Sequence, residues 1–290
     1  MIQSLSATFG VSELCALLET SRSGYYAWRS GGRGKRARGD RELAEQILRV
    51  HRRSRGTYGS LRITKELQAQ GATCGHNRVA RIMRDCGLKG VQRARFRPRT
   101  TDSNHGDPIS PNRLKEGIAI TGPNQVWVAD ITYIPTKEGW TYLSAFLDLW
   151  SRAVKGWTLR DTLKSNLVSD AFLQAVFRHR PAENLIVHSD RGSQYASREF
   201  RGHLAAHKAL GSMSRKGNCY DNATMESFFA TLKTEVFDRK IADSRRQAEL
   251  LVFDYIETFY NPRRLHSCLG YKSPVEFETQ HHQQPNLPHT

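Results

Sequence analysis

Cysteine is scarce in this sequence of 290 residues, and the five cysteines form no paired motif. They stand at positions 15, 74, 86, 219 and 268, without the CxxC spacing that is typical of zinc sites. We therefore predict neither a disulfide framework nor a zinc knuckle. A reducing compartment suits this composition.

Long apolar segments are also missing. The sequence holds no run of about 18 apolar residues, and no cationic segment followed by an apolar one opens the chain. Secretion and insertion into a membrane are therefore not expected. We expect a soluble protein of the cytoplasm.

Acidic residues are few in the first third of the chain. Residues 1–100 hold 21 Lys and Arg against 7 Asp and Glu, so most of the net charge of +16 lies there. A basic excess confined to one segment is typical of a polyanion binder, because neutralising phosphates releases condensed counterions. Nucleic acid is therefore the first partner to consider. The alternative is a solvated basic face that only aids solubility.

Apolar periodicity divides the basic part into modules. Residues 1–30 show two short helical patterns around a tight turn and predict a helix-turn-helix. Residues 31–39, GGRGKRARG, are rich in glycine and charge and predict a basic linker. Three apolar stripes over residues 40–89 predict a second helix-turn-helix DNA-binding domain, and a second linker follows over residues 90–117.

Arginine recurs every three residues in the last helical pattern of the second module. Arg78, Arg81 and Arg84 lie opposite the apolar positions, as a helix along a phosphate-lined groove requires. Together with Arg62 they are the candidate DNA-binding residues. The alternative is that these arginines only solvate the outside of a three-helix bundle.

The rest of the chain predicts an α/β core over residues 118–280, followed by a disordered tail over residues 281–290. Residues 124–134, NQVWVADITYI, are apolar on both faces, as a central strand buried on two sides requires. Residues 140–150 and 153–159 predict two more strands that form an antiparallel meander with the first. Helices and short strands alternate after them.

Three acidic residues stand in contexts that suit a metal site. Asp130 lies inside the first strand, where a carboxylate is costly to bury unless it is paired or binds a cation. Asp190 ends the apolar segment LIVHSD, at the edge where ligands bind in open α/β sheets. Glu226 lies in the first turn of a helix predicted over residues 223–237, and Lys233, seven positions later, returns to nearly the same face.

Carboxylates on separate elements are what a two-metal site for phosphoryl transfer needs. Two divalent cations about 3.5–4 Å apart can then stabilise both the attacking and the leaving oxygen. Two simpler interpretations stay open. Asp130 can be neutralised by a neighbouring arginine, and Glu226 and Lys233 can form an ordinary exposed charge pair. His188, two positions before Asp190, is interpreted as a packed core histidine.

Longer motifs over residues 12–280 indicate a particular protein family. They are SRSGYYAW, RGTYGSLRI, NRVARIM, VWVADITYI, HSDRGSQY, SMSRKGNCYDNATMESFFATLK, YIETFYNPRRLH and LGYKSPVEF. On these motifs the chain resembles the second-frame transposases of the insertion sequence 3 family of bacteria. It is similar, more distantly, to retroviral integrases, although it lacks their His/Cys zinc module. The motif YNPRRLH fits the insertion-sequence family narrowly, but the sequence assigns it no role.

The resemblance implies a ribonuclease-H-like mixed sheet flanked by helices, which forms an integrase catalytic core. It implies that Asp130, Asp190 and Glu226 are catalytic residues and hold two Mg²⁺ or Mn²⁺ ions, and that Lys233 lies near the DNA. The expected activity is a transposase of the bacterial cytosol that binds terminal inverted repeats, cleaves DNA strands and transfers them to target DNA.

Expected partners are the double-stranded DNA of the transposon ends and of the target, and further copies of this chain, since two ends must be brought together. A fusion to, or association with, an upstream-frame protein is also expected, although no sustained heptad seam is present here. Two other functions stay open. One is a non-catalytic DNA-binding regulator of transposition, and the other is a ribonuclease-H-type nuclease or junction resolvase.

Overall fold

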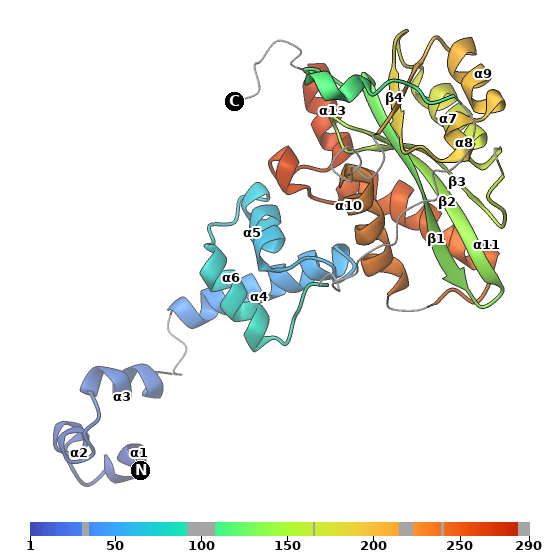
Figure 1. The fold of residues 1–290 in the computed structure, drawn as a ribbon. Coiled ribbons are helices and arrows are strands. Elements are labelled where there is room, and N and C mark those ends of the chain that lie inside the picture. The colour runs from blue at the N-terminus through green and yellow to red at the C-terminus, as the bar shows by residue number, and fades with distance from the viewer. Residues whose placement is uncertain (31–34, 92–107, 165, 215–222, 239–240, 284–290) are drawn as a thin grey trace. The chain divides into compact units, whose positions relative to one another are not determined.

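The computed structural model describes residues 1–30, 35–91, 108–164, 166–214, 223–238 and 241–283 (Figure 1). The chain divides into two units, Met1–Gly90 and Val91–Thr290. No helix among the described residues combines the length and the apolar character that crossing a membrane requires.

The first unit is helical throughout. Its N-terminal part contains α1 (Ile2–Leu5), α2 (Val11–Leu17) and α3 (Arg22–Arg29). Leu14 and Cys15 of α2 and Tyr25 of α3 are buried, and α2 packs against both neighbours. The hydroxyl of Ser21 accepts a hydrogen bond from the backbone N–H of Gly24 and so caps α3.

Three further helices pack pairwise in the same unit. They are α4 (Lys35–Arg53), α5 (Ser60–Ala69) and α6 (His76–Asp85), and they bury Ile47, Ile63, Leu67, Val79 and Ile82 between them. Helix α4 begins at Lys35, so the prediction that the linker extends to residue 39 is wrong for its last five residues. Lys, Arg and Ala are good helix formers, which offsets the cost of the glycine at position 39. Residues 31–34 lie outside the described residues.

The second unit is built on a five-stranded sheet with the order β3-β2-β1-β4-β5. Strands β1, β2 and β3 are antiparallel neighbours, whereas β4 runs parallel to β1 and β5 runs parallel to β4. The predicted mixed sheet is therefore confirmed, and the central strand is the one that carries Asp130. The strands are β1 (Val126–Thr136), β2 (Gly139–Asp148), β3 (Val154–Arg160), β4 (Ile186–Ser189) and β5 (Leu210–Met213).

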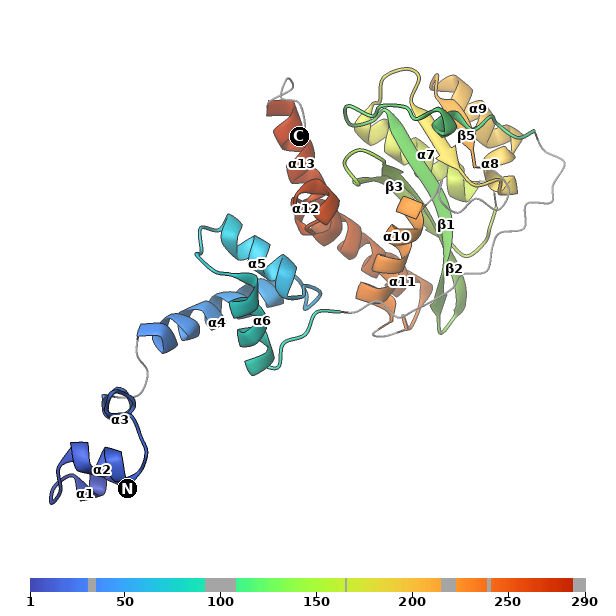
Figure 2. The ribbon, with the colours of Figure 1, turned by 60° about the vertical axis from the view of Figure 1, so that its left-hand side comes forward.

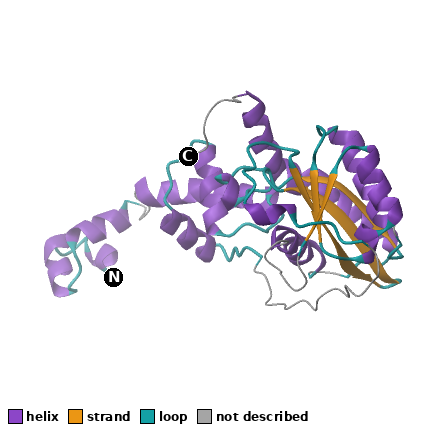
Figure 3. Cartoon of the chain, turned by 45° about the horizontal axis from the view of Figure 1, so that its top comes forward, coloured by secondary structure: helices purple, strands orange, loops and turns teal. Residues whose placement is uncertain are grey.

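Helices cover both faces of this sheet, as Figures 2 and 3 show. Before β1 the chain forms a short 3₁₀ turn, η1 (Arg113–Glu116). One face of the sheet carries α7 (Asn166–His179), α8 (Ser193–Ala196) and α9 (Arg198–Ala206). Between this face and its helices lies an apolar core that includes Trp127, Phe146, Phe172, Phe200 and Leu204.

The opposite face carries the C-terminal helices, beginning with α10 (Ala223–Leu232), which packs against β1. The helix predicted over residues 223–237 is regular only to Leu232, because the chain then widens into a π-helical turn. The later elements are η3 (Lys233–Phe237), α11 (Arg245–Phe253), η4 (Asp254–Tyr260), α12 (Asn261–Arg263), η5 (Ser267–Leu269) and α13 (Pro274–Gln283).

Gly156 lets the backbone of α7 approach β3 closely. A Cβ atom at this position would lie 2.4 Å from the carbonyl oxygen of Ala171 and 2.8 Å from the backbone nitrogen of Ala175. We therefore expect Gly156→Ala to lower the free energy of unfolding by about 1–3 kcal/mol, because backbone must move to relieve the overlap. Chemical denaturation measures this loss.

Gly202→Ala is the matched control, because a Cβ there meets no atom within 4 Å. Since Gly202 lies inside α9, this change should stabilise the protein by about 0.5–1 kcal/mol. Equal effects of the two substitutions would contradict the close approach at Gly156.

Candidate active site

The register of the two parallel strands brings Asp130 and Asp190 to the same level of the sheet. Val128 of β1 is the partner of His188 of β4, and each aspartate follows its paired residue by two positions. Because side chains alternate along a strand, a spacing of two keeps both carboxylates on one face. Strand β4 ends at Ser189, so Asp190 begins the loop at the carboxyl end of that strand.

Backbone amides orient both aspartates. Asp130 Oδ1 accepts a hydrogen bond of 2.8 Å from the backbone N–H of Ile131, and Asp190 Oδ1 accepts one of 3.0 Å from Gly192. A Cβ atom at Gly192 would lie 3.0 Å from Asp190 Oδ1, so glycine leaves room for the carboxylate. Both aspartates are partly buried.

Glu226 approaches from the helix on the same side of the sheet as these carboxylates. It is exposed in the first turn of α10, and α10 packs against β1. Lys233 follows two turns later, where the π-helical segment η3 begins, and is partly buried. Asp190, Glu226 and Lys233 are all near enough to Asp130 to act on its charge.

The charges of these residues act on one another. Burial raises the pKa of Asp130 to about 8, and the negative charges of Asp190 and Glu226 contribute to the rise. The hydrogen bond from Ile131 and the ammonium of Lys233 act in the opposite direction. The pKa of Lys233 is lowered, chiefly by burial, although Asp238 and Asp130 favour its charged form. The site therefore carries an excess of negative charge that its own residues do not neutralise.

Within the described parts of the chain, no three side chains of His, Cys, Asp or Glu lie close enough together to hold a metal ion. His188 does not join the carboxylates. It is fully buried, and its Nδ1 lies 2.9 Å from the hydroxyl of Ser212 on β5. This is the packed core histidine that we expect from the sequence.

The raised pKa of Asp130 has a consequence for stability. Below about pH 4 this carboxyl is protonated in both the folded and the unfolded chain, but up to about pH 8 only the folded chain retains the proton. The contribution of Asp130 to stability therefore falls as the pH rises through this window. We expect Asp130→Asn to raise the melting temperature of the metal-free protein at pH 8 by several degrees, since one pKa unit corresponds to about 1.4 kcal/mol.

Thermal unfolding at a series of pH values between about 5 and 8.5 measures this effect. Asp170→Asn is the control, because it makes the same chemical change on α7 at a side chain that is 40% exposed and paired with Arg160. If the melting temperature of Asp130→Asn falls with pH as steeply as that of the wild type, the explanation is wrong.

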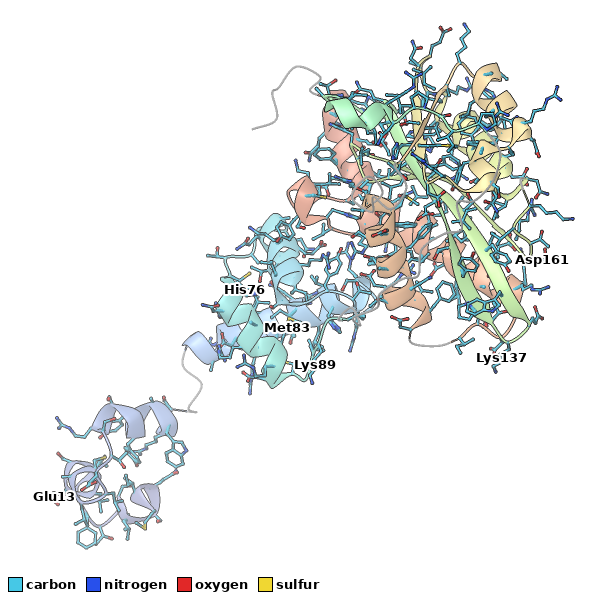
Figure 4. The ribbon with its side chains drawn as sticks, viewed as in Figure 1. Glu13, His76, Met83, Lys89, Lys137 and Asp161 are labelled. Carbon is cyan, nitrogen blue, oxygen red and sulfur yellow. The ribbon has the colours of Figure 1, made fainter. Side chains whose placement is uncertain are left out.

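Two of the three predicted DNA-binding arginines of α6 are held by one carboxylate. Arg78 Nε lies 2.7 Å from Asp40 Oδ1, and Arg81 Nη2 lies 2.6 Å from Asp40 Oδ2. The sequence did not predict this role of Asp40, and the only local signal is that Asp40 is the first acidic residue after Glu19 in a basic segment. In Figure 4, His76 and Met83 label the helix that carries these arginines.

The two other predicted arginines have different surroundings. Arg84 is exposed in the last turn of α6. The guanidinium carbon of Arg62 lies over the ring of Tyr58, 5.8 Å from its centre. A guanidinium over an aromatic ring at this distance is attracted to the ring face.

Two kinds of family model match the chain. Residues 38–96 match the model described as HTH-like domain, and residues 120–219 and 226–281 match models described as Integrase core domain. Solved structures with a similar chain trace include the simian T-cell lymphotropic virus intasome in complex with PP2A regulatory subunit B56 gamma. The identity is 18%, the match covers 84% of this chain and 76% of that chain, and the TM-score is 0.48.

Sequence relatives match over almost their entire length. A Shigella sonnei protein named Insertion element IS600 uncharacterized 31 kDa protein is 42% identical over 270 residues, which are 93% of this chain and 99% of that protein. Transposase InsF for insertion sequence IS3A of Escherichia coli strain K12 is 40% identical over 279 residues, 96% of each chain. The chain therefore belongs to the insertion sequence 3 family of transposases, with a ribonuclease-H-like integrase core and an HTH-like domain before it.

Proposed function

We propose that this transposase cuts and joins DNA strands with Asp130, Asp190 and Glu226 as its catalytic residues. The observation that supports the proposal is that the charges of Asp190, which follows β4, and of Glu226 on α10 act on the buried carboxyl of Asp130 in β1. Burial, together with the negative charges of Asp190 and Glu226, favours the protonated form of Asp130. An acidic cluster of this kind is costly unless a cation offsets its charge.

The donor set fits Mg²⁺ or Mn²⁺, because hard divalent ions prefer carboxylate oxygens. We propose that Asp130, Asp190 and Glu226 would hold two such ions. When bound, such ions stabilise the charge that develops on the attacking and leaving oxygens of a phosphodiester. Glu226 is exposed in the first turn of α10, so its side chain can rotate toward the aspartates on binding.

The proposed reaction has two displacement steps. In the first, water attacks a phosphorus atom at the end of the element, the P–O3′ bond breaks, and the 3′-oxygen leaves with a proton from solvent. In the second, the new 3′-hydroxyl attacks a phosphodiester of the target and displaces its 3′-oxygen in the same way. Lys233 binds a nearby phosphate in this scheme. No covalent link between enzyme and DNA and no Ser or Tyr nucleophile is needed.

The basic first unit is proposed to bind the terminal inverted repeats. Residues 1–30 and 40–89 supply two DNA-binding modules, with α6 as the recognition helix and Arg62 as a further contact. Residues 90–117 link them to the catalytic core at 118–280. We propose an assembly of two or more copies on paired ends, with target DNA as the second substrate and an upstream-frame protein as a possible fusion partner.

Asp40 should weaken this DNA binding. Because both of its oxygens are bound by Arg78 and Arg81, a DNA phosphate must compete with it for the same guanidinium groups. We expect Asp40→Asn to tighten binding to DNA of any sequence at low salt. The slope of log affinity against log salt should become steeper by about 1, as one added phosphate contact implies.

Fluorescence anisotropy with a labelled duplex measures both quantities. Glu45→Gln is the control, because it removes one negative charge from an exposed position of the same helix, α4. If the two substitutions tighten DNA binding equally, the ion pairs of Asp40 have no specific role. If Asp40→Asn weakens DNA binding, the proposed competition between Asp40 and a DNA phosphate is wrong.

An assay of DNA cleavage with end-containing duplexes tests the proposed function. The wild-type chain should nick these duplexes only when Mg²⁺ or Mn²⁺ is present and should then yield strand-transfer products. Cleavage without transfer would favour the nuclease or resolvase. Binding without cleavage at every metal concentration would favour the non-catalytic regulator.

A further inference from the structure

A buried ion pair joins the segment YNPRRLH to the helix that carries Glu226. Arg264 binds Glu235 at two points, with Nη2 2.7 Å from Oε1 and Nε 3.0 Å from Oε2. The two side chains are only 6% and 7% exposed. Glu235 lies in η3, two positions after Lys233, and Arg264 directly follows α12.

Tyr255 completes this buried group. Its hydroxyl donates a hydrogen bond of 2.8 Å to Glu235 Oε2, and the tyrosine itself is 1% exposed in η4. A buried ion pair repays its desolvation only where the geometry is good and further hydrogen bonds satisfy the charges. The pair with its tyrosine meets this condition and fixes the π-helical turn that follows Glu226 and Lys233.

A second set of contacts holds the other end of the same helix. Arg152, in the turn between β2 and β3, donates a hydrogen bond of 2.7 Å to the hydroxyl of Thr224. Thr224 stands two positions before Glu226 in α10. The ring of Phe228 lies 4.9 Å from the ring of Tyr260, which is the first residue of YNPRRLH.

Asn261 ties this segment to the sheet. Its side-chain Oδ1 accepts a hydrogen bond from the backbone N–H of Val154, and its Nδ2 donates one to the carbonyl of Val154, both at 2.9 Å. The amide thus pairs with β3 in the manner of a neighbouring strand. As a result, the C-terminal segment is bound to the sheet through Asn261 and to α10 and η3 through Tyr260 and Arg264.

We propose that Arg264 is a positioning residue for the catalytic carboxylates, an inference that rests on the proposed function. Through Glu235 it fixes α10 and η3, so that Glu226 and Lys233 are held toward Asp130. Glu226 is exposed, and the position of its carboxylate is therefore set by the helix that carries it. A displacement of about 1 Å at a catalytic group can cost on the order of 10²-fold in rate.

Two mild substitutions test the proposal in the full-length chain. Arg264→Lys keeps the charge but loses the paired N–H groups, and Tyr255→Phe removes one hydrogen bond to Glu235. Leu204→Ala is the stability control, because it removes core volume at a buried position of α9, on the opposite face of the sheet. Turnover in DNA cleavage and affinity for Mn²⁺ by calorimetry are measured at a temperature where circular dichroism shows every variant folded.

We expect Arg264→Lys to lower turnover and to weaken Mn²⁺ binding by about 10-fold or more, as is usual when a group that supports metal ligands is changed. Tyr255→Phe should have a smaller effect in the same direction, and Leu204→Ala should match the wild type in both. Wild-type values for the two test variants, or equal losses in Leu204→Ala, would overturn the proposal.

The two readouts also separate the proposal from the function on which it rests. If the wild type binds Mn²⁺ but never cleaves DNA, the proposed function fails, and weaker Mn²⁺ binding by Arg264→Lys alone still supports the positioning role. If the wild type neither cleaves DNA nor binds Mn²⁺, both are overturned.

Discussion

Asp130→Asn, Asp190→Asn and Glu226→Gln should each reduce DNA cleavage by on the order of 10³-fold or more and leave the binding of transposon ends unchanged. Each substitution keeps the size of the side chain and removes one negative charge. A neutral amide is a much poorer ligand for a hard divalent ion than a carboxylate. A 10³-fold loss corresponds to about 4 kcal/mol of transition-state stabilisation.

Nicking of a labelled end duplex and gel-shift binding measure the two properties on the same preparations. The unfolding experiments supply an internal check, because we expect metal-free Asp130→Asn to be more stable than the wild type at pH 8. An inactive variant that is also more stable cannot owe its inactivity to misfolding. Cleavage at more than a tenth of the wild-type rate by any of the three variants would remove that residue from the catalytic set.

Arg264→Met should lower the free energy of unfolding of the second unit by about 3–5 kcal/mol. The substitution leaves the carboxylate of Glu235 buried without its partner, and the hydroxyl of Tyr255 alone cannot replace two N–H donors. Tryptophan fluorescence in a urea titration follows this unit, because four of the five tryptophans lie in it, the buried Trp127 among them.

The double variant Arg264→Met with Glu235→Met distinguishes a lost pair from lost packing. Replacing both charges by apolar groups of similar size is often neutral or stabilising, so the double variant should recover most of the loss. If Arg264→Met costs less than about 1 kcal/mol, or if the double variant is as unstable as the single one, the pair is not what stabilises this region.

Much of the core could be predicted from local patterns. The segment NQVWVADITYI predicts a buried central strand, and β1 occupies the middle of the sheet with bounds two residues later than expected. The apolar segment that ends at Asp190 is a parallel neighbour of β1. These predictions succeed because a strand that is buried on both faces is apolar at consecutive positions, and this pattern is visible in the sequence.

The errors lie where contacts between distant residues decide the structure. The helix predicted over residues 223–237 changes to a π-helical turn at Lys233, where Glu235 binds an arginine 29 positions later in the chain. Asp40 binds two arginines about 40 positions away, and no periodicity connects them.

The sequence by itself determined the element types, the basic first third, and the three acidic residues that stand at a strand, a strand end and a helix start. It could do so because propensity, periodicity and charge act within a few residues. Only the tertiary structure decided that Arg264 of YNPRRLH pairs with Glu235, that Asp40 holds Arg78 and Arg81, and that Asp130 carries a strongly raised pKa. Each of these depends on burial and on a partner far along the chain, and both arise only when the elements pack together.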